Sequence, residues 1–174
     1  MDSSYIISAH QAEQLPPYEL REIGVLGRSN CGKSSLLNAL FNTKKLVKTG
    51  STPGHTQMIN FFRLRTTEGE MIFADLPGYG YSATGKGTRK HWESLIDAYV
   101  ERENIKEFMF LVDCRRAPQE EDRAMFQSLA GIKPTRLIIT KSDKLNQSEQ
   151  QKSKSKYISY FVTKEVRAEG VHIV

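Results

Sequence analysis

Residues 27–34 read Gly27-Arg28-Ser29-Asn30-Cys31-Gly32-Lys33-Ser34 and fit the pattern G-x-x-x-x-G-K-[ST] at every fixed position. The apolar run Ile23–Leu26 before them predicts a strand, and the pattern Ser34–Phe41 after them predicts a helix. In this context the backbone N–H groups of the loop wrap a phosphate chain, and the helix N-terminus adds partial positive charge. Lys33 supplies a charge to the terminal phosphates, and the Ser34 hydroxyl is a ligand for Mg²⁺. The stretch therefore predicts a nucleoside-phosphate site.

Short apolar runs alternate with helical patterns along the rest of the chain. The expected strands are 59–64, 71–74, 108–112 and 137–140, and the expected helices are 89–102 and 118–129. A loop is the alternative for residues 147–156, but they run into apolar residues at helical spacing and are predicted to be the polar first turns of a further helix that Gly170 stops, before the apolar run Val171–Val174. The apolar residues are Tyr157, Ile158, Phe161, Val162 and Val166. This order predicts an α/β, three-layer, doubly wound and mostly parallel sheet with helices on both faces, plus one antiparallel hairpin. Ligands of such sheets bind at the carboxyl ends of the strands.

A second motif, Asp75-Leu76-Pro77-Gly78, follows the expected strand 71–74. A carboxylate at this strand end can hold Mg²⁺ through a bound water, and the Gly78 N–H can reach a γ-phosphate. The pattern D-x-x-G is also common in ordinary turns. Its place at a strand end, after a phosphate loop, favours the nucleotide role.

A third motif, Thr140-Lys141-Ser142-Asp143, ends the expected strand 137–140. The Asp143 carboxylate can accept two hydrogen bonds from N1–H and the exocyclic amine of guanine, a donor pair that adenine lacks. The Lys141 side chain can lie over the base or brace the phosphate loop. The order of the three motifs predicts a guanine nucleotide rather than a solvated charged loop.

The composition sets limits on the class of protein. The chain has 174 residues, 25 Lys and Arg against 20 Asp and Glu, a net charge of +5, and 39% hydrophobic residues. These values predict one globular domain, 1–174, in which 1–20 lead into the first strand. Two cysteines form neither a disulfide framework nor a four-ligand zinc site. The sequence shows no signal peptide and no membrane-spanning run, so a soluble cytoplasmic protein is expected, and its charge permits a nucleic-acid partner.

Residues 49–57 form a small, polar, glycine-rich stretch between the first two motifs. A threonine in such a loop can complete Mg²⁺ coordination and contact the γ-phosphate, which orders the loop. The candidates are Thr43, Thr49, Thr52 and Thr56, and their positions alone do not choose between them.

The motif set resembles the EngB (YihA/YsxC) family of bacterial GTPases, which are translation-factor-class, Ras-like G domains of the P-loop NTPase type. The likeness covers roughly residues 8–174 and includes G-R-S-N-C-G-K-S, S-T-P-G-H-T-Q, I-N-F-F, D-L-P-G-Y-G-Y and T-K-S-D. It implies a GTP-binding and GTP-hydrolysing switch in large ribosomal subunit assembly, linked to normal cell division and septation. The implied partners are GTP or GDP, the precursor of the large subunit and its rRNA, with no membrane, and the protein is expected to be a monomer.

The resemblance also implies which residues form the site. The implied catalytic residues are Lys33, Thr56 and Gly78, and the implied Mg²⁺ ligands are Ser34 and Thr56, with Asp75 acting through water. The implied GTP contacts are Gly27, Arg28, Ser29, Asn30, Cys31, Gly32, Lys33, Ser34, Gly54, His55, Thr56, Gln57, Met58, Asp75, Leu76, Pro77, Gly78, Thr140, Lys141, Ser142 and Asp143. Asn30 stands where potassium-activated relatives hold K⁺, and a loop-stabilising role for Asn30 is the alternative.

Two departures matter for activity. Tyr79 follows the second motif, where Ras-type enzymes have a water-orienting Gln, so slow intrinsic hydrolysis is expected until a partner or a cation completes the site. The family pattern continues with a small-residue loop that contacts the guanine oxygen, and the sequence ends at Val174, before it. Either the sequence is truncated there or the base site is incomplete, which would weaken base affinity and leave the phosphate site intact.

Several alternatives stay open. Lys86, Arg89 and Lys90 lie in a basic second switch loop that either meets rRNA or is simply solvated. Cys31 is either a low-pKa thiol or a small residue that fills the loop. The rival functions are an ATPase or small-molecule kinase, which T-K-S-D opposes, and a non-enzymatic nucleotide- or RNA-binding scaffold, which Tyr79 and the missing loop leave open.

Overall fold

A computed structural model describes residues 1–17, 20–43, 46–47, 58–80, 86–162 and 170–174, with side chains of the helix that begins at residue 86 described from residue 90. The strands are β1 (Asp2–Ala9), β2 (Glu22–Gly27), β3 (Ile59–Thr66), β4 (Gly69–Asp75), β5 (Ile105–Asp113), β6 (Thr135–Thr140) and β7 (Gly170–Ile173). The α-helices are α1 (Lys33–Leu40), α2 (Lys86–Val100), α3 (Glu120–Ile132) and α4 (Gln147–Phe161), and the short 3₁₀ helices are η1 (Ala12–Gln14) and η2 (Ser142–Lys144). Every strand and helix predicted between residues 23 and 140 is present.

The strands form one sheet in the order β1-β3-β4-β2-β5-β6-β7. β2 pairs in parallel with β4 and β5, and β5-β6-β7 continue the parallel part. The predicted hairpin, β3 and β4, is antiparallel and turns at Thr66–Gly69, where Gly69 has a φ of 135°. The expected mostly parallel sheet is confirmed.

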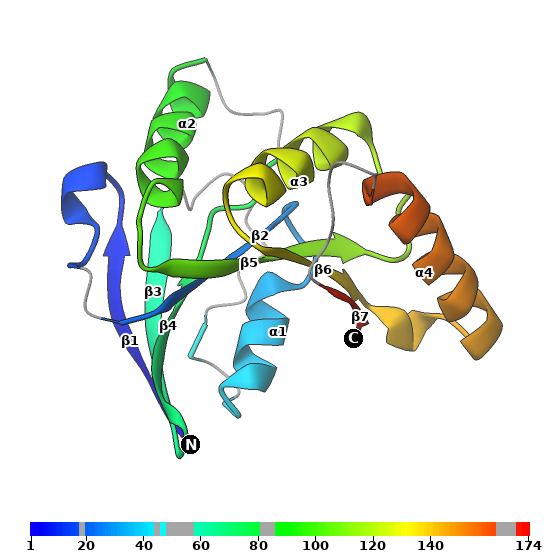
Figure 1. The fold of residues 1–174 in the computed structure, drawn as a ribbon, viewed down its shortest axis with the longest axis horizontal. Coiled ribbons are helices and arrows are strands. Elements are labelled where there is room, and N and C mark those ends of the chain that lie inside the picture. Colours follow the sequence, from blue (N-terminus) through cyan, green and yellow to red (C-terminus); the bar gives the residue numbers. More distant parts are fainter. Residues whose placement is uncertain (18–19, 44–45, 48–57, 81–85, 163–169) are drawn as a thin grey trace.

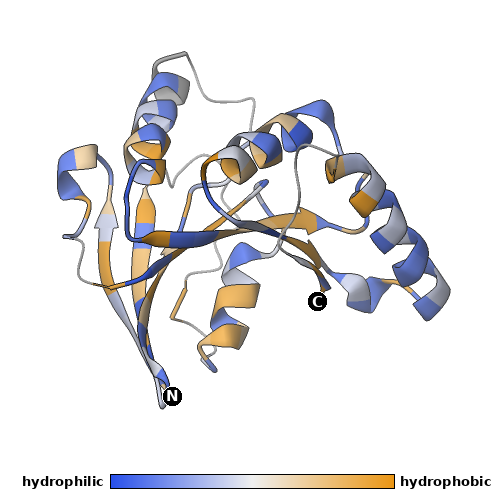
Figure 2. Ribbon diagram, in the orientation of Figure 1, coloured by the Kyte–Doolittle hydropathy of each residue, from blue (hydrophilic) through white to orange (hydrophobic). Residues whose placement is uncertain are grey.

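The helices bury two separate apolar layers against the sheet. Figure 1 shows α1 on one side of the sheet and α2 and α3 on the other. Leu37 of α1 packs with Val25, Leu111 and Ile138, while the neighbouring strand residues face a larger core that includes Phe126 of α3. This alternation follows from the two-residue period of a strand, and Figure 2 shows the hydrophobic residues concentrated on the central strands. Among the described residues, no helix is long and apolar enough to cross a membrane.

The first strand corrects the predicted lead-in. Residues Asp2–Ala9 form an edge strand that pairs antiparallel with β3, from Asp2 opposite Arg65 to Ala9 opposite Ile59. The pairing shifts register between Tyr5 and Ile7, which is an irregularity typical of edge strands. The N-terminal segment therefore extends the sheet instead of only leading into it.

The last predicted helix is present, but its predicted end is wrong. α4 begins at Gln147 with a capping box, in which the Asn146 side chain accepts from the Glu149 N–H at 3.0 Å, so residues 147–156 are helical. The helix ends at Phe161, and Gly170 belongs to β7. Gly170 therefore does not stop the helix, and Val166 lies outside the described residues.

Candidate nucleotide-binding site

The phosphate loop, residues 27–34, runs from the end of β2 into the first turn of α1. Gly32 is the N-cap of α1 and has a φ of 106°, a left-handed conformation that glycine adopts without strain. Asn30 has a φ of 63°, which asparagine tolerates better than most residues. The unpaired N–H groups of the first helical turn then face a site suited to anions.

Close packing under the loop explains its first glycine. A Cβ atom at Gly27 would lie 2.5 Å from the carbonyl oxygen of Leu111 and 2.6 Å from the Sγ atom of Cys31. The Cys31 side chain is buried, and burial raises the pKa of its thiol although the Lys33 ammonium opposes the shift. Of the two roles considered for Cys31, the structure supports the small residue that fills the loop.

The Asp75–Gly78 loop lies directly against the phosphate loop, because β4 and β2 are neighbours. The Ser29 N–H donates to the carbonyl oxygen of Tyr79 at 3.2 Å, and a Cβ at Gly78 would lie 2.8 Å from the Ser29 nitrogen. Trp92 of α2 donates from Nε1 to the carbonyl oxygen of Pro77 at 3.3 Å. Only glycine permits this approach, so the structure brings the Gly78 backbone to the phosphate loop.

Asp75 is a buried carboxylate at the end of β4. Its Oδ1 atom has no hydrogen-bond partner among the described residues. Burial raises the pKa of Asp75 to about 6, although the Lys33 ammonium lowers it. A buried charged oxygen without a partner is costly unless a cation or water completes it. This carboxylate and the hydroxyl of Ser34, in the first turn of α1, therefore fit the oxygen ligation that Mg²⁺ prefers.

The Thr140–Asp143 loop is tied to the back of the phosphate loop. The Thr140 hydroxyl lies 2.5 Å from the Cys31 carbonyl oxygen, and Lys141 donates from Nζ to the Asn30 carbonyl oxygen at 2.6 Å. Of the two roles predicted for Lys141, the structure shows the brace.

Asp113 is a site residue that the sequence reasoning missed. Its buried carboxylate accepts from Lys141 at 2.9 Å and from Arg115 at 2.7 Å. Burial alone would raise the pKa of Asp113, but the hydrogen bonds from Arg115 and Lys141 outweigh it and hold the pKa well below its usual range. The available signal was an acidic residue at the carboxyl end of β5, the same position that identified Asp75 on β4.

Asp143 differs from the other two acids because it is exposed. It lies in η2 and pairs with Lys144 at 2.8 Å, and the hydrogen bond from Lys144 lowers its pKa. The side chains of this pair are 67% and 62% exposed, so the Lys144 contact is easily exchanged for another partner. The carboxylate is ionised and accessible, as base recognition requires.

The side chains of Arg28 and Tyr79 face α3. Arg28 donates from Nη1 to Gln119 at 2.6 Å and to Asp122 at 3.3 Å. The buried Tyr79 ring stacks on Phe110, and its hydroxyl donates to Asp122 at 3.0 Å. Burial and the Asp122 charge raise the pKa of Tyr79 well above its usual value, so the hydroxyl stays protonated. Within the phosphate loop, the contribution of Arg28 to a nucleotide would come from its backbone.

Comparisons with known proteins agree with this geometry. A profile of the family described as 50S ribosome-binding GTPase matches residues 22–142. The probable GTP-binding protein EngB of Geobacter sulfurreducens is 42% identical over 155 residues, which are 88% of this chain and 74% of the relative. The protein of the same description from Protochlamydia amoebophila is 48% identical over 141 residues, 80% of this chain and 67% of the relative.

This chain belongs to the EngB family of GTP-binding proteins. It carries a GTPase domain, which answers the ATPase and kinase alternatives in favour of GTP. Two solved structures share the fold. A probable GTP-binding protein EngB has a TM-score of 0.66 at 24% identity and 88% coverage of both chains. A variant of Era from Aquifex aeolicus, bound to GDP and AlF₄⁻, has a TM-score of 0.71 at 21% identity, covering 90% of this chain and 51% of that one.

Part of the site that the EngB resemblance predicts lies outside the described residues. Gly54, His55, Thr56 and Gln57 fall there, and so do Thr49 and Thr52. Met58 is described and directly precedes β3. Each of the three motifs lies at the carboxyl end of its own strand: the phosphate loop at β2, Asp75–Gly78 at β4 and Thr140–Asp143 at β6. Because these strands are parallel, the fold brings the three motifs to one edge of the sheet.

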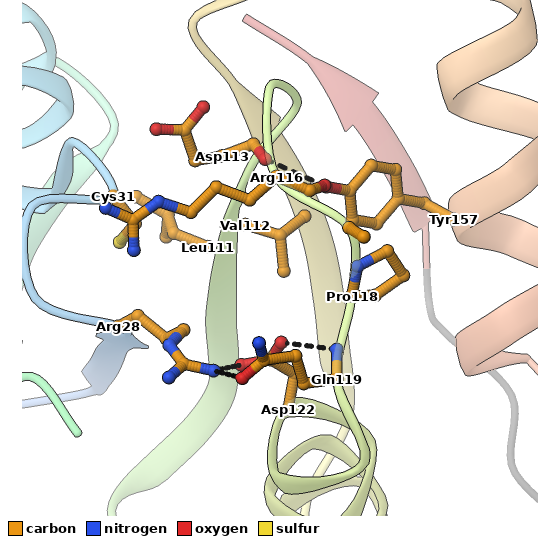
Figure 3. A pocket seen from close by; sticks show the side chains of 11 residues that line it. Arg28, Cys31, Leu111, Val112, Asp113, Arg116, Pro118, Gln119, Asp122 and Tyr157 are labelled. Atoms are coloured by element: carbon orange, nitrogen blue, oxygen red, sulfur yellow. Dashed lines mark hydrogen bonds and ion pairs between the residues drawn. The ribbon is translucent and has the colours of Figure 1, made fainter. Parts of the chain in front are cut away.

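A cavity of about 310 Å³ lies next to the phosphate loop, between the end of β5 and α3 (Figure 3). Arg28 and Cys31 line it from the phosphate loop, and Asp122 and Tyr157 line it from α3 and α4. The Tyr157 hydroxyl donates to the carbonyl oxygen of Asp113 at 2.8 Å. Neither Lys33 nor Asp75 is among its lining residues, so this cavity adjoins the predicted phosphate site instead of containing it.

Proposed function

We propose that this chain is a GTP-dependent switch that acts in assembly of the large ribosomal subunit. The observation that carries the proposal is the contact between Gly78 and Ser29, which joins the Asp75–Gly78 loop to the phosphate loop. A γ-phosphate bound between these loops would be present before hydrolysis and lost after it, so their positions would report the nucleotide state. The family description, 50S ribosome-binding GTPase, supports the ribosomal part of the proposal.

The proposed roles of the residues follow from their places in the fold. Lys33 and the Gly78 N–H hold the terminal phosphate, and water attacks it in line. Ser34 and Thr56 bind Mg²⁺, with Asp75 acting through water, and the bound ion would neutralise charge on the phosphate oxygens. The Tyr79 hydroxyl is committed to Asp122, so residue 79 provides no group to orient the attacking water. Slow intrinsic hydrolysis is therefore part of the proposal.

Potassium activation is a further part of the proposal. Asn30 has an exposed side chain, and Lys141 holds its backbone carbonyl. An amide oxygen at this point of the phosphate loop is a suitable ligand for a monovalent cation beside the phosphates. Faster turnover in K⁺ than in Na⁺ at equal ionic strength supports this role, and equal turnover favours a loop-stabilising role.

The proposed partner is the precursor of the large subunit and its rRNA. Three basic residues are exposed: Lys90 lies on α2, and Arg115 and Arg116 lie just after the carboxyl end of β5. The net charge of the chain is +5. Such residues contact RNA through its phosphates. We propose a monomeric, cytoplasmic, single G domain, 1–174, whose own surface meets the particle and whose loss disturbs cell division and septation.

The decisive experiment measures phosphate release from GTP in K⁺ and in Na⁺, with and without purified large ribosomal subunits. We expect at least about tenfold stimulation by the subunits, because a partner completes a site that lacks a water-orienting side chain. Lys33→Ala is the matched control and should lose nucleotide binding. RNA recovered with protein locked in the GTP state should exceed that recovered with GDP. Turnover at background under every condition would favour the scaffold.

Base recognition has its own test in Asp143→Asn. The variant should bind GTP about 10- to 100-fold more weakly, because a hydrogen bond to a charged group is lost, and should gain affinity for xanthosine triphosphate. The measurement is competition of both nucleotides against labelled GDP. Since Asp143 is exposed, thermal stability should not change. Lys144→Gln is the matched control, and an unchanged preference for GTP in Asp143→Asn refutes the base-reading role.

A further inference from the structure

Three side chains from three separate elements meet at one buried point. Asp122 lies in α3, Arg28 in the phosphate loop, and Tyr79 directly after the Asp75–Gly78 loop. The Asp122 Oδ1 atom accepts from the Tyr79 hydroxyl at 3.0 Å and from Arg28 Nη1 at 3.3 Å. Figure 3 shows Arg28 pointing at Asp122 from across the cavity. A single carboxylate oxygen therefore links both loops to α3.

The second oxygen fixes this carboxylate in place. The Asp122 Oδ2 atom accepts from the Gln119 N–H at 2.8 Å, which caps the amino end of α3. Asp122 is 4% exposed, so its charge depends on Arg28 and on the positive end of the helix for stabilisation. The carboxylate cannot shift without breaking the cap of α3.

The network is one residue away from both sides of the contact between the two loops of the phosphate site. Arg28 precedes Ser29, Tyr79 follows Gly78, and the Ser29 N–H donates to the Tyr79 carbonyl oxygen at 3.2 Å. Moving either arm would therefore change the contact between Ser29 and Gly78. Arg28 also covers Gly80, where a Cβ would lie 2.8 Å from its Nε atom.

We infer that Asp122 is a positioning residue for GTP hydrolysis, which sets the relative place of the two phosphate-contacting loops through Arg28 and Tyr79. This inference rests on the proposed function, and Asp122 touches no reacting atom. In this chain residue 79 serves to hold the Gly78 backbone, and the water-orienting task is left to other groups. The neighbouring Glu121 offers a natural comparison, because its side chain is 54% exposed and lies 3.6 Å from Arg28.

The test compares Tyr79→Phe, Asp122→Asn and Glu121→Gln in single-turnover GTP hydrolysis and in binding of GDP and a non-hydrolysable GTP analogue. Tyr79→Phe removes one hydroxyl. Asp122→Asn breaks the network in either orientation of the amide, because its NH₂ group replaces either the oxygen that accepts from both arms or the oxygen that accepts from the Gln119 N–H. We expect both variants to lower the hydrolysis rate and the ratio of analogue to GDP affinity by about tenfold. Glu121→Gln should match the wild type.

A merely structural role would produce a different pattern. If Tyr79 and Asp122 act through one network, the double variant should be no worse than Asp122→Asn alone. The binding ratio does not depend on turnover, so a slow intrinsic rate does not obscure the result. The inference is overturned if both single variants keep the wild-type rate and affinity ratio while their melting temperatures fall, or if their effects simply multiply in the double variant.

Discussion

Asp75→Asn is expected to stabilise the nucleotide-free protein at pH 7 while removing the benefit of Mg²⁺ for nucleotide binding. The Asp75 carboxylate is buried with one oxygen unpartnered among the described residues, and its pKa is raised from 3.8 to about 6. Because the folded state holds the charged form poorly, ionisation of this group above pH 6 works against folding. One pKa unit corresponds to about 1.4 kcal/mol, so the neutral amide should raise the free energy of unfolding by up to about 3 kcal/mol.

The sign of the pH dependence follows from the same shift. The raised pKa of Asp75 does not change the free energy of unfolding below pH 3.8, where the carboxyl is protonated in the folded and the unfolded state. It lowers the free energy of unfolding most above pH 6, where the carboxyl is ionised in both states. Urea unfolding of the nucleotide-free protein in EDTA should therefore show a clear advantage of Asp75→Asn at pH 7 that shrinks at pH 5. Asp97→Asn, which neutralises an exposed carboxylate on α2, is the matched control and should change little.

The second arm of this prediction concerns the ligand. Wild-type protein should bind GTP more tightly with Mg²⁺ than with EDTA, and Asp75→Asn should show nearly equal affinities, because an amide is a weaker ligand for a hard cation than a carboxylate. The opposite directions of the two effects set this prediction apart from general damage to the fold. Loss of stability together with an intact Mg²⁺ effect would contradict the assignment of Asp75.

The phosphate-site motifs could be predicted because each lies at the end of its own strand. A local pattern marked β2, β4 and β6, and parallel pairing then placed Lys33, Asp75 and Asp143 at one edge of the sheet. The brace from Lys141 was among the predicted roles for the same reason. A local sequence pattern does not reveal which distant residue a side chain contacts in the folded protein.

Most of the features that were missed are of that long-range kind. Tyr79 and Asp122 are 43 residues apart, and Arg28 and Asp122 are 94 apart, so no spacing rule joins them. β1 was missed because its polar sequence is stabilised by pairing with β3, a strand distant in the sequence. The end of α4 was misplaced because the apolar spacing was extended past Phe161, whereas Val162 directly after the helix already has extended backbone.

Arg102→Ala is expected to be the most destabilising single change at a site remote from the nucleotide. Arg102 is 3% exposed and contacts Glu22, which is 1% exposed, with Nη2–Oε1 at 2.6 Å and Nε–Oε2 at 3.2 Å. Arg102 also donates to the carbonyl oxygen of Pro16 at 2.8 Å, which ties the N-terminal segment to the end of α2. Removing one partner leaves a buried charge alone and should lower the free energy of unfolding by about 3–5 kcal/mol.

The Arg102–Glu22 pair lies far enough from the nucleotide site for its effect on stability to be measured apart from nucleotide binding. Glu22 begins β2 and the phosphate loop follows its end, roughly 16 Å away at about 3.3 Å per residue, so the folded Arg102→Ala protein should bind GDP with wild-type affinity. Urea unfolding should show Glu22→Ala/Arg102→Ala losing far less than the sum of the single changes, because neither charge is left alone. Arg65→Ala, which breaks the exposed pair with Glu70, also at 2.6 Å, should cost at most about 1 kcal/mol. The two pairs have the same 2.6 Å distance and differ in burial. Equal losses in Arg102→Ala and Arg65→Ala would therefore contradict the expectation that burial makes the Arg102–Glu22 pair the costlier one to break.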